Sequence, residues 1–229
     1  MKQLIILLII FSSINSYAQN NDTSRHESLK IESNNHMHQL IVPAALIIVG
    51  TISEINFNPS LDNELFKERN THIPRFKTKA DDFLQYSPIL LAYGFDAIGM
   101  HSKTDIINRS VILLKSELLM AGTVTVLKHS IRELRPDSSA RNSLPSGHTA
   151  QAFAAAAFLS EEFGKRYKWV PYLSYSIAST VGALRIMNNK HFLSDVLIGA
   201  GIGMLTTKIS YWTHQYKWGT KKKLKTYFN

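Results

Sequence analysis

Residues 192–212 read FLSDVLIGAGIGMLTTKISYW, and this stretch says most about the fold. It is long enough for a helix of about six turns. The glycines at 199, 201 and 203 would let a second helix approach closely, as small residues do where helices pack, in membranes especially. No segment of the chain alternates apolar and polar residues over a useful length, so we expect no sheet. The sequence therefore predicts an all-α protein.

Other segments of the chain have the same helical rhythm, and one of them is rich in alanine between residues 150 and 157. Residues 58–82 mix charges with two prolines and are typical of a loop or a short surface helix. We expect a helical core over 83–213, followed by a basic tail over 214–229. The helices predicted within this core are 83–100, 106–127, 149–163, 169–187 and 192–212.

The N-terminus has the pattern of a secretory signal peptide over residues 1–18. Lys2 is followed by an apolar run from Leu4 to Phe11, and Ser16-Tyr17-Ala18 is typical of a cleavage site. An anchor helix is the alternative, but eight strongly apolar residues are too few for a bilayer core that needs about 20. Residues 19–82 are predicted to be a polar leader with an apolar segment at 40–55, which we expect not to span the membrane but to be interfacial or packed on the bundle.

The mean hydropathy of −0.08 and the charges inside the predicted helices leave a soluble helical bundle open. We favour a membrane bundle, because the last two helices are long, rich in glycine and alanine, and bordered by tyrosine and tryptophan. Such aromatic residues suit the lipid–water boundary. Clusters of lysine and arginine mark one side of a bundle with five crossings as cytoplasmic, and they include Lys165, Arg166 and the lysines from 217 to 225. The expected location is a bacterial inner membrane, with several crossings.

The net charge of +9 indicates an anionic partner, such as a phosphorylated substrate or an anionic lipid. The basic residues are scattered rather than gathered in one stripe, and the usual nucleic-acid motifs are missing, so we expect no nucleic-acid partner. The chain has no cysteine, which excludes disulfides and thiolate metal sites. The oligomeric state is left open.

Three blocks of residues carry candidate chemistry, and the first runs from Lys128 to Arg135-Pro136. Lysine and arginine seven residues apart recur after about two helical turns, so both could reach one point from one helix face. Two converging cations would make an anion site, in which arginine offers a planar fork to phosphate. Basic residues that merely cap a helix C-terminus are common, however, and the block alone is weak.

The second block is Pro145-Ser146-Gly147-His148, directly before the alanine-rich helix. The free N–H groups at the start of that helix suit an oxyanion, and Gly147 allows a ligand to approach closely. Ser146 could equally be a simple helix cap. A histidine beside an anion site could donate a proton to a leaving oxygen.

The third block contains Arg185, His191 and Asp195. The histidine and the aspartate are four residues apart and so lie on one helix face. A carboxylate bonded to one ring nitrogen leaves the lone pair of the other free to attack. Such a pair on a surface helix is often only a weak stabilising contact. With three cations nearby, however, it matches phosphoryl transfer to a nitrogen nucleophile, which needs no metal or cofactor.

The chain resembles the type 2 phosphatidic acid phosphatase superfamily, in its membrane lipid phosphatase branch. The signature K-x6-R-P, P-S-G-H and S-R-x5-H-x3-D is present with the family's order and spacing, except that Leu184 replaces the first serine of the third motif. The resemblance covers roughly residues 83–211 and implies a helical bundle with the three blocks at its periplasmic rim. It implies catalytic roles for His191, His148 and Asp195, and phosphate binding by Lys128, Arg135, Ser146, Gly147 and Arg185.

We expect a metal-independent phosphatase that acts on a membrane lipid head group through a phosphohistidine. The glycines after Asp195 look most like those of lipid A phosphatases, so lipid A is the favoured substrate. Undecaprenyl diphosphate is the first alternative, and a soluble secreted acid phosphatase of broad specificity is the second. A vanadate-dependent haloperoxidase is disfavoured by the short chain. A non-catalytic lipid carrier is disfavoured by the complete set of candidate catalytic residues.

Overall fold

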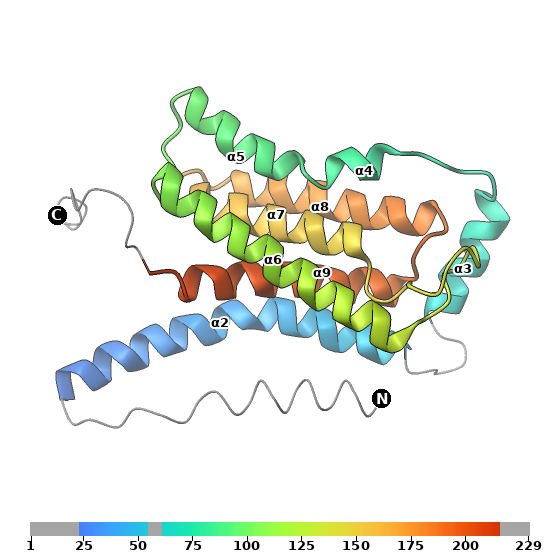
Figure 1. Ribbon diagram of the computed structural model, residues 1–229, viewed down its shortest axis with the longest axis horizontal. Coiled ribbons are helices and arrows are strands. Elements are labelled where there is room, and N and C mark those ends of the chain that lie inside the picture. The colour runs from blue at the N-terminus through green and yellow to red at the C-terminus, as the bar shows by residue number, and fades with distance from the viewer. Residues whose placement is uncertain (1–22, 55–60, 216–229) are drawn as a thin grey trace. The chain divides into compact units, whose positions relative to one another are not determined.

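A computed structural model describes residues 23–54 and 61–215, and within these ranges it contains helices and no strand, which confirms the all-α class. The chain divides into two compact units, residues 1–41 and 42–229, and helix α2 crosses the boundary between them. All other described helices belong to the second unit. The helices (Figure 1) are α2 Thr23–Glu54, α3 Leu61–His72, α4 Ala80–Leu84, α5 Ser87–Ala97, α6 Ile106–Ile131, α7 Gly147–Phe163, α8 Val170–Met187 and α9 Leu193–Trp212.

The predicted helices agree with α6 to α9 to within a few residues, but the one expected over 83–100 is two helices, α4 and α5. Pro88 lies in the first turn of α5. A proline is accepted there because its missing N–H has no helical partner at that position, and it favours a helix start. The chain turns at Gln85 and Tyr86, and this break directs α4 toward a different neighbour from α5.

The N-terminal segments differ from expectation in part. Residues 19–39 were predicted to be a loose leader, yet Thr23–Glu54 is one continuous helix that passes through Pro43. The apolar part of this helix packs on α9 at Pro43 and Ile47, which agrees with the expectation that segment 40–55 is interfacial or packed on the bundle. The stretch Met37–Glu54 is long and apolar enough to cross a membrane, as is α6. The predicted signal peptide and most of the basic tail lie outside the described residues.

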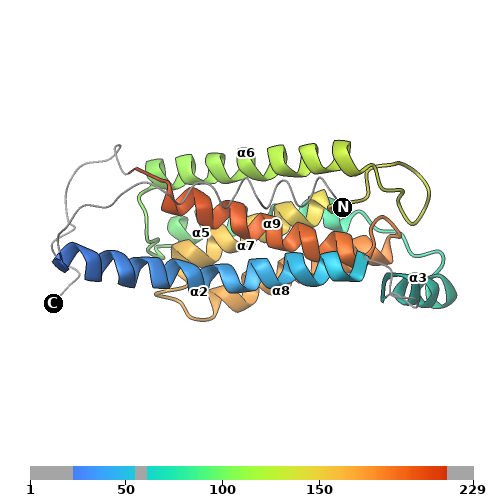
Figure 2. The same ribbon diagram turned by 90° about the horizontal axis from the view of Figure 1, so that it is seen from below.

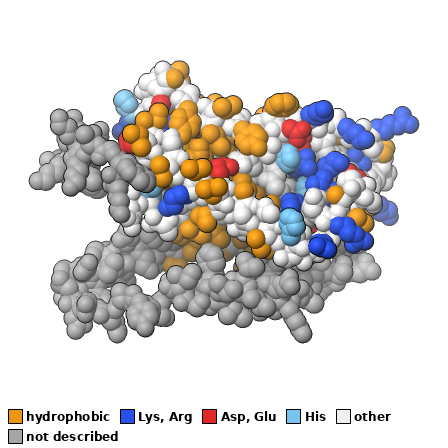
Figure 3. All heavy atoms as spheres, viewed as in Figure 1, with side chains coloured by type: hydrophobic (Ala, Val, Ile, Leu, Met, Phe, Trp, Pro, Cys, Tyr) orange, Lys and Arg blue, Asp and Glu red, His pale blue; other side chains and the backbone are white. Residues whose placement is uncertain are grey.

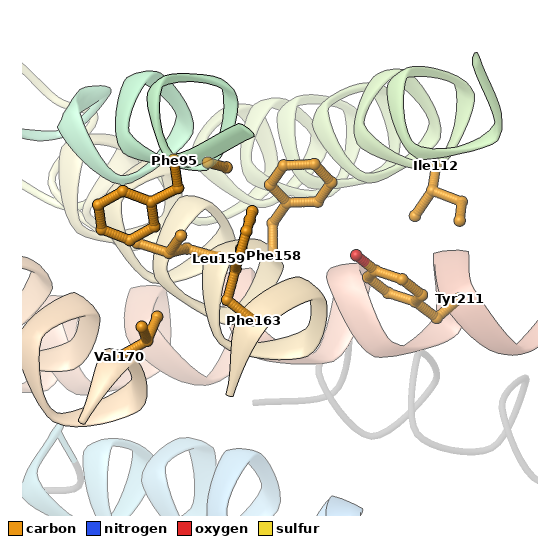
Figure 4. Packing of buried hydrophobic residues seen from close by; sticks show 8 residues of the cluster. Phe95, Ile112, Phe158, Leu159, Phe163, Val170 and Tyr211 are labelled. Atoms are coloured by element: carbon orange, nitrogen blue, oxygen red, sulfur yellow. The ribbon is translucent and has the colours of Figure 1, made fainter. Parts of the chain in front are cut away.

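The centre of the second unit is α7, which packs against α8 and α9 and also contacts α5 and α6 (Figure 2). Alanines line much of its buried surface, so neighbouring helices can approach it from several sides. Toward the C-terminal end of α7 the core becomes aromatic (Figure 4). The residues of this cluster include Phe95, Ile112, Phe158, Leu159, Phe163, Val170 and Tyr211.

Glycines of α9 allow the close approach that the sequence indicated. A β-carbon on Gly199 would lie 2.6 Å from the carbonyl oxygen of Ser146 on α7, and one on Gly203 would collide with that of Ala150. Gly201 faces another helix, since a β-carbon there would lie 2.6 Å from the carbonyl oxygen of Pro43 on α2. The glycines therefore bring α9 against α7 on one side and α2 on the other.

The surface of the second unit separates apolar from charged side chains (Figure 3). Lysine, arginine and histidine gather at the end where α3 lies, whereas hydrophobic side chains cover the middle over α5 and α6. The large hydrophobic side chains exposed on α5 and α6 are Leu90, Ile106, Ile107, Leu114, Leu118, Leu119, Val126 and Ile131. Soluble monomers rarely expose so continuous an apolar surface.

Candidate active site

The three blocks meet at one end of the bundle, because four helices begin or end there. The C-termini of α6 and α8 and the N-termini of α7 and α9 share this end with α3 and α4 (Figure 1). The blocks lie at the helix ends, as the sequence indicated, and the connections 132–146 and 188–192 bring them together.

His191 lies two residues before the start of α9 and is buried, with 2% of its surface exposed. Its Nδ1 lies 3.2 Å from Oδ2 of Asp195, a fully buried residue in the first turn of α9. With Asp195 ionised, Nδ1 carries the proton and donates it to the carboxylate, so Nε2 keeps its lone pair. The pair expected from the spacing is therefore formed, with the ring oriented by its carboxylate.

Asp195 also joins the third block to the second. Its Oδ2 accepts hydrogen bonds from Oγ of Ser143 at 2.5 Å and from the backbone N–H of Phe192 at 2.9 Å. Its backbone oxygen accepts from the N–H of Ser146 at 3.0 Å. These hydrogen bonds fix the position of the carboxylate beside His191. Ser143 was not identified from the sequence, although it stands two residues before the second block.

Burial lowers the pKa of His191 from its usual 6.5 to about 4. The charge of Asp195 opposes this shift, whereas the charges of Arg185 and Lys128 add to it. The imidazole is therefore neutral at pH 7, as a nucleophile requires. The same interactions show that cations from the first and third blocks act on the histidine together.

The first block reaches the site in a different way from the one predicted. Helix α6 ends at Ile131, and Arg132 has the left-handed conformation with φ of 53°, so Lys128 and Arg135 do not share a helix face. The chain instead folds back after α6. Nζ of Lys128 donates to the carbonyl oxygens of Asn142 and, at 3.2 Å, Ser143. This anchors the connection that carries Arg135 over the end of α6.

Arg135 and Arg185 repel each other, and each has an unused donor among the described residues. Burial lowers the pKa of Arg135, and the charge of Arg185 lowers it further. The Nε atoms of both arginines are buried and have no hydrogen-bond partner in the described part of the chain. Mutually repelling cations with unused N–H groups are an arrangement that a bound anion would stabilise.

The second block forms the start of α7. Ser146 stands at the N-cap position, but its hydroxyl bonds the hydroxyl of Thr149 at 2.9 Å and does not cap the helix. The first helical acceptor is used by Ala150, whose N–H donates to the carbonyl oxygen of Ser146. The preceding N–H groups of Gly147 and His148 therefore have no partner within the helix and are available to an oxyanion.

His148 bonds a residue from outside the three blocks. Its Nε2 lies 2.8 Å from Oδ1 of Asp82 on α4, and Nη1 of Arg185 lies 2.6 Å from Oδ2 of Asp81. Among the described residues, Asp81, Asp82 and His148 form the one set whose ligand atoms are close enough to share a metal ion. Both aspartates lie at the end of the stretch 58–82 that was predicted to be a loop or a short surface helix, and no pattern in the sequence singled them out.

Helix α3 supports the turn that carries His191. Oδ1 of Asp62 accepts from the backbone N–H of Ser194 at 3.0 Å, and Nε of Arg69 donates to the carbonyl oxygen of Met187 at 3.0 Å. A small hollow lies between α3 and this turn, with Phe66, Arg69 and His191 among its lining residues. The three cations do not line this hollow, so we expect the phosphate on the other side of His191.

Glu133 adds a carboxyl group near Lys128 without cancelling its charge. Burial raises the pKa of Glu133, and the charges of Asp195, Glu54 and Asp62 raise it further. A neutral Glu133 leaves the positive charge of Lys128 unbalanced by this carboxyl group. No pattern in the sequence singled out this residue.

Residues 109–219 match the PAP2 superfamily. The chain is 37% identical over 163 residues to a lipid A 1-phosphatase of Porphyromonas gingivalis, a match that covers 70% of this chain and 36% of that protein. It is 26% identical over 169 residues to a probable diacylglycerol pyrophosphate phosphatase of Schizosaccharomyces pombe, covering 55% of this chain and 60% of that one. The chain thus spans about a third of the first relative and three fifths of the second.

Two solved structures have a similar arrangement. That of Aquifex aeolicus LpxE has a TM-score of 0.48 at 24% identity and covers 65% of this chain and 93% of that one. That of a transmembrane PAP2-type phosphatidylglycerolphosphate phosphatase of Bacillus subtilis has a TM-score of 0.46 at 23% identity, covering 75% and 94%. By its sequence match and its relatives, the chain belongs to the PAP2 superfamily.

Proposed function

We propose that the protein is a membrane-embedded phosphatase that removes phosphate from a lipid head group through a phosphohistidine at His191. The observation that carries this proposal is the buried His191, held through Nδ1 by Asp195, with Arg185 and Lys128 close enough for their charges to lower its pKa. Nε2 would attack phosphorus while His148 protonates the leaving oxygen. Water would then hydrolyse the phosphohistidine.

The proposed phosphate ligands are Lys128, Arg135, Arg185 and the N–H groups at the start of α7. Lysine and arginine can neutralise the non-bridging oxygens, which is most of what phosphoryl transfer requires from a protein. The proposed reaction therefore uses no metal ion. Leu184 stands where the family pattern has serine, so one hydroxyl donor near the phosphate is replaced by an apolar side chain.

The exposed apolar side chains over the middle of the bundle support a position inside a membrane (Figure 3). They disfavour the soluble acid phosphatase, which would have to keep this surface in water. The lipid A substrate is supported by the 37% identity to the Porphyromonas gingivalis lipid A 1-phosphatase. A lipid diphosphate such as undecaprenyl diphosphate remains the second candidate, since the other relative is named for a lipid diphosphate.

The substrate is tested by phosphate release from a panel of phosphorylated lipids with purified full-length protein in detergent. We expect release from lipid A to exceed release from undecaprenyl diphosphate, phosphatidylglycerol phosphate and phosphatidic acid. A preference for the diphosphate would overturn the lipid A assignment and keep the phosphatase. No release from any lipid would overturn the proposed function itself.

The proposed location is the bacterial inner membrane, with the site facing the periplasm. Because the chain has no cysteine, single cysteines report each side cleanly. Ser139→Cys lies in the connection 132–146 at the site, and Lys168→Cys lies between α7 and α8 at the opposite end (Figure 1). An impermeant thiol reagent should label the first in intact cells and the second only after permeabilisation. The reverse pattern would place the site in the cytoplasm.

A further inference from the structure

Helix α4 presents two adjacent carboxylates to two residues of the proposed site. Asp82 bonds Nε2 of His148 at 2.8 Å, and Asp81 bonds Nη1 of Arg185 at 2.6 Å. Neither aspartate belongs to the three sequence blocks, and both precede residue 109, where the family match begins. The partners are 66 and 104 residues away in sequence, so the contacts depend on how α4 is docked.

The docking of α4 is specific. Asn188, in the turn after α8, donates from Nδ2 to the carbonyl oxygen of Thr78 at 3.0 Å and to Oδ1 of Asp81 at 3.1 Å. Its Oδ1 accepts from the N–H of Thr78 at 2.9 Å. The side chain of Gln85 donates to the carbonyl oxygen of Asp82 at 2.9 Å. The backbone on both sides of Asp82 is therefore fixed, although 49% of its side chain is exposed.

The same three residues could be taken for a metal site, because the ligand atoms of Asp81, Asp82 and His148 lie within 4.8 Å of one another. Hydrogen bonding favours a different arrangement. One oxygen of Asp81 accepts from Arg185 and the other from Asn188. A dication at this place would compete with both donors and would be repelled by the guanidinium. We therefore interpret the set as a hydrogen-bonded network that holds site residues.

The contact with Asp82 determines which nitrogen of His148 can act as an acid. Nε2 is occupied by the carboxylate, so the proton for the leaving group has to come from Nδ1. A carboxylate bonded to Nε2 also favours the imidazolium, the form that has a proton to give. Burial lowers the pKa of His148 and the charge of Arg185 lowers it further, whereas the hydrogen bond and charge of Asp82 and the charge of Asp81 raise it. The contact with Asp82 therefore offsets part of a shift that would otherwise favour the neutral ring.

We infer that Asp82 is a positioning residue for general-acid catalysis by His148, an inference that rests on the proposed phosphatase function. As Nε2 of His191 forms its bond to phosphorus, the bond from phosphorus to the leaving oxygen breaks, and that oxygen takes the Nδ1 proton of His148. His148 becomes neutral and still donates Nε2–H to Asp82. In the second half, water attacks phosphorus and gives a proton back to Nδ1, and the phosphorus–nitrogen bond breaks.

The test is a leaving-group series, because a good leaving group needs no proton. Nitrophenyl phosphate, phenyl phosphate and an alkyl phosphate leave with increasingly basic oxygens. Asp82→Ala should lower kcat about tenfold for the alkyl ester and by less than about twofold for the nitrophenyl ester. The tenfold loss is a part of the factor of about 10²–10⁴ that a general acid contributes to the rate. His148→Ala should show the same pattern more strongly. The double variant should be no slower than His148→Ala alone.

Three further variants separate positioning from a structural role. Asp82→Asn keeps an acceptor oxygen without the charge and should lose less than Asp82→Ala. Asp81→Asn acts on Arg185 and should raise KM for all three esters alike. Glu68→Ala breaks a comparable exposed pair, Glu68 with His72 at 3.1 Å, and should change nothing.

Equal loss on all esters with Asp82→Ala, or no loss on any, would overturn the inference. The proposed function is judged separately, by whether the unmodified protein releases phosphate from any of the phosphorylated lipids. If it releases none, the phosphatase proposal fails, and the inference about Asp82 fails with it.

Discussion

The carboxylate of Asp195 lies 3.2 Å from Nδ1 of His191, and the helix that carries the aspartate begins two residues after the histidine. The same oxygen accepts the N–H of Phe192, which forms part of the cap of α9. The residue that orients the proposed nucleophile is thus also the residue that fixes the start of the helix. The carboxylate of Asp195 therefore both orients the imidazole of His191 and stabilises the start of α9.

Asp195→Asn should lower kcat by about 10²–10⁴, by analogy with the buried aspartate of serine proteases, because the ring loses the acceptor that fixes its tautomer. Ser143→Ala removes one hydrogen bond to the carboxylate and keeps the pair, so a loss of about tenfold or less is expected. Steady-state kinetics with nitrophenyl phosphate measures both. A fully active Asp195→Asn protein would exclude the proposed orienting role.

The pH dependence should reflect the lowered pKa of His191, about 4 in the folded protein. Between pH 6.5 and 4 the unfolded chain binds a proton at this position and the folded chain does not, so stability falls as pH falls through this window. The acid limb of kcat/KM should lie near pH 4, and activity should persist at about pH 5. The contrary result would be an acid limb near pH 6.5 together with an NMR titration in which the chemical shifts of His191 change near the same pH.

Activity should survive EDTA, because we assign the neutralisation of the phosphate charge to Lys128, Arg135 and Arg185. Orthovanadate should inhibit, since it occupies an anion site with a geometry like that of the transition state. Arg135→Ala should weaken vanadate inhibition more than Arg141→Ala, an arginine in the same connection that is exposed. If EDTA inactivates the protein and Mg²⁺ or Zn²⁺ restores activity, then a metal ion, and not these side chains, neutralises the phosphate.

The packing of α9 on α7 is tested by Gly203→Ala. The added β-carbon would collide with the carbonyl oxygen of Ala150 and lie 2.8 Å from the N of Ala154, so we expect a loss of about 1–3 kcal/mol in unfolding free energy. Gly122→Ala on α6 is the matched control, since its added carbon would meet no side chain or neighbouring helix within 4 Å in the described part of the chain. Thermal unfolding in detergent should show a lower midpoint for the first variant alone. An unchanged midpoint in both would contradict the close contact.

The sequence predicted much of this arrangement because the relevant information is local. A histidine and an aspartate four residues apart must share a helix face, and prolines and glycines mark where helices end or touch. The meeting of the three blocks followed from the family resemblance, and the helix bounds of α6 to α9 followed from composition.

The parts that could not be predicted depend on contacts between distant segments. The docking of α4 brings Asp81 to Arg185 across 104 residues, and nothing near Asp81 in the sequence indicates this partner. The polar residues before Leu40 suggested a loose leader, whereas they continue the helix α2. The shared helix face expected for Lys128 and Arg135 was wrong because Arg132 ends the helix between them.

The central claim is that His191 becomes phosphorylated during turnover, and trapping that intermediate tests it most directly. The protein would be mixed with ³²P-labelled substrate, quenched in alkali, which preserves phosphohistidine, and digested for peptide mapping. We predict label on the peptide that contains His191, with more of it accumulating when the water step is slowed by His148→Ala and the substrate is nitrophenyl phosphate. Label on another residue, or His191→Ala protein that still turns over at a near-normal rate, would contradict the account.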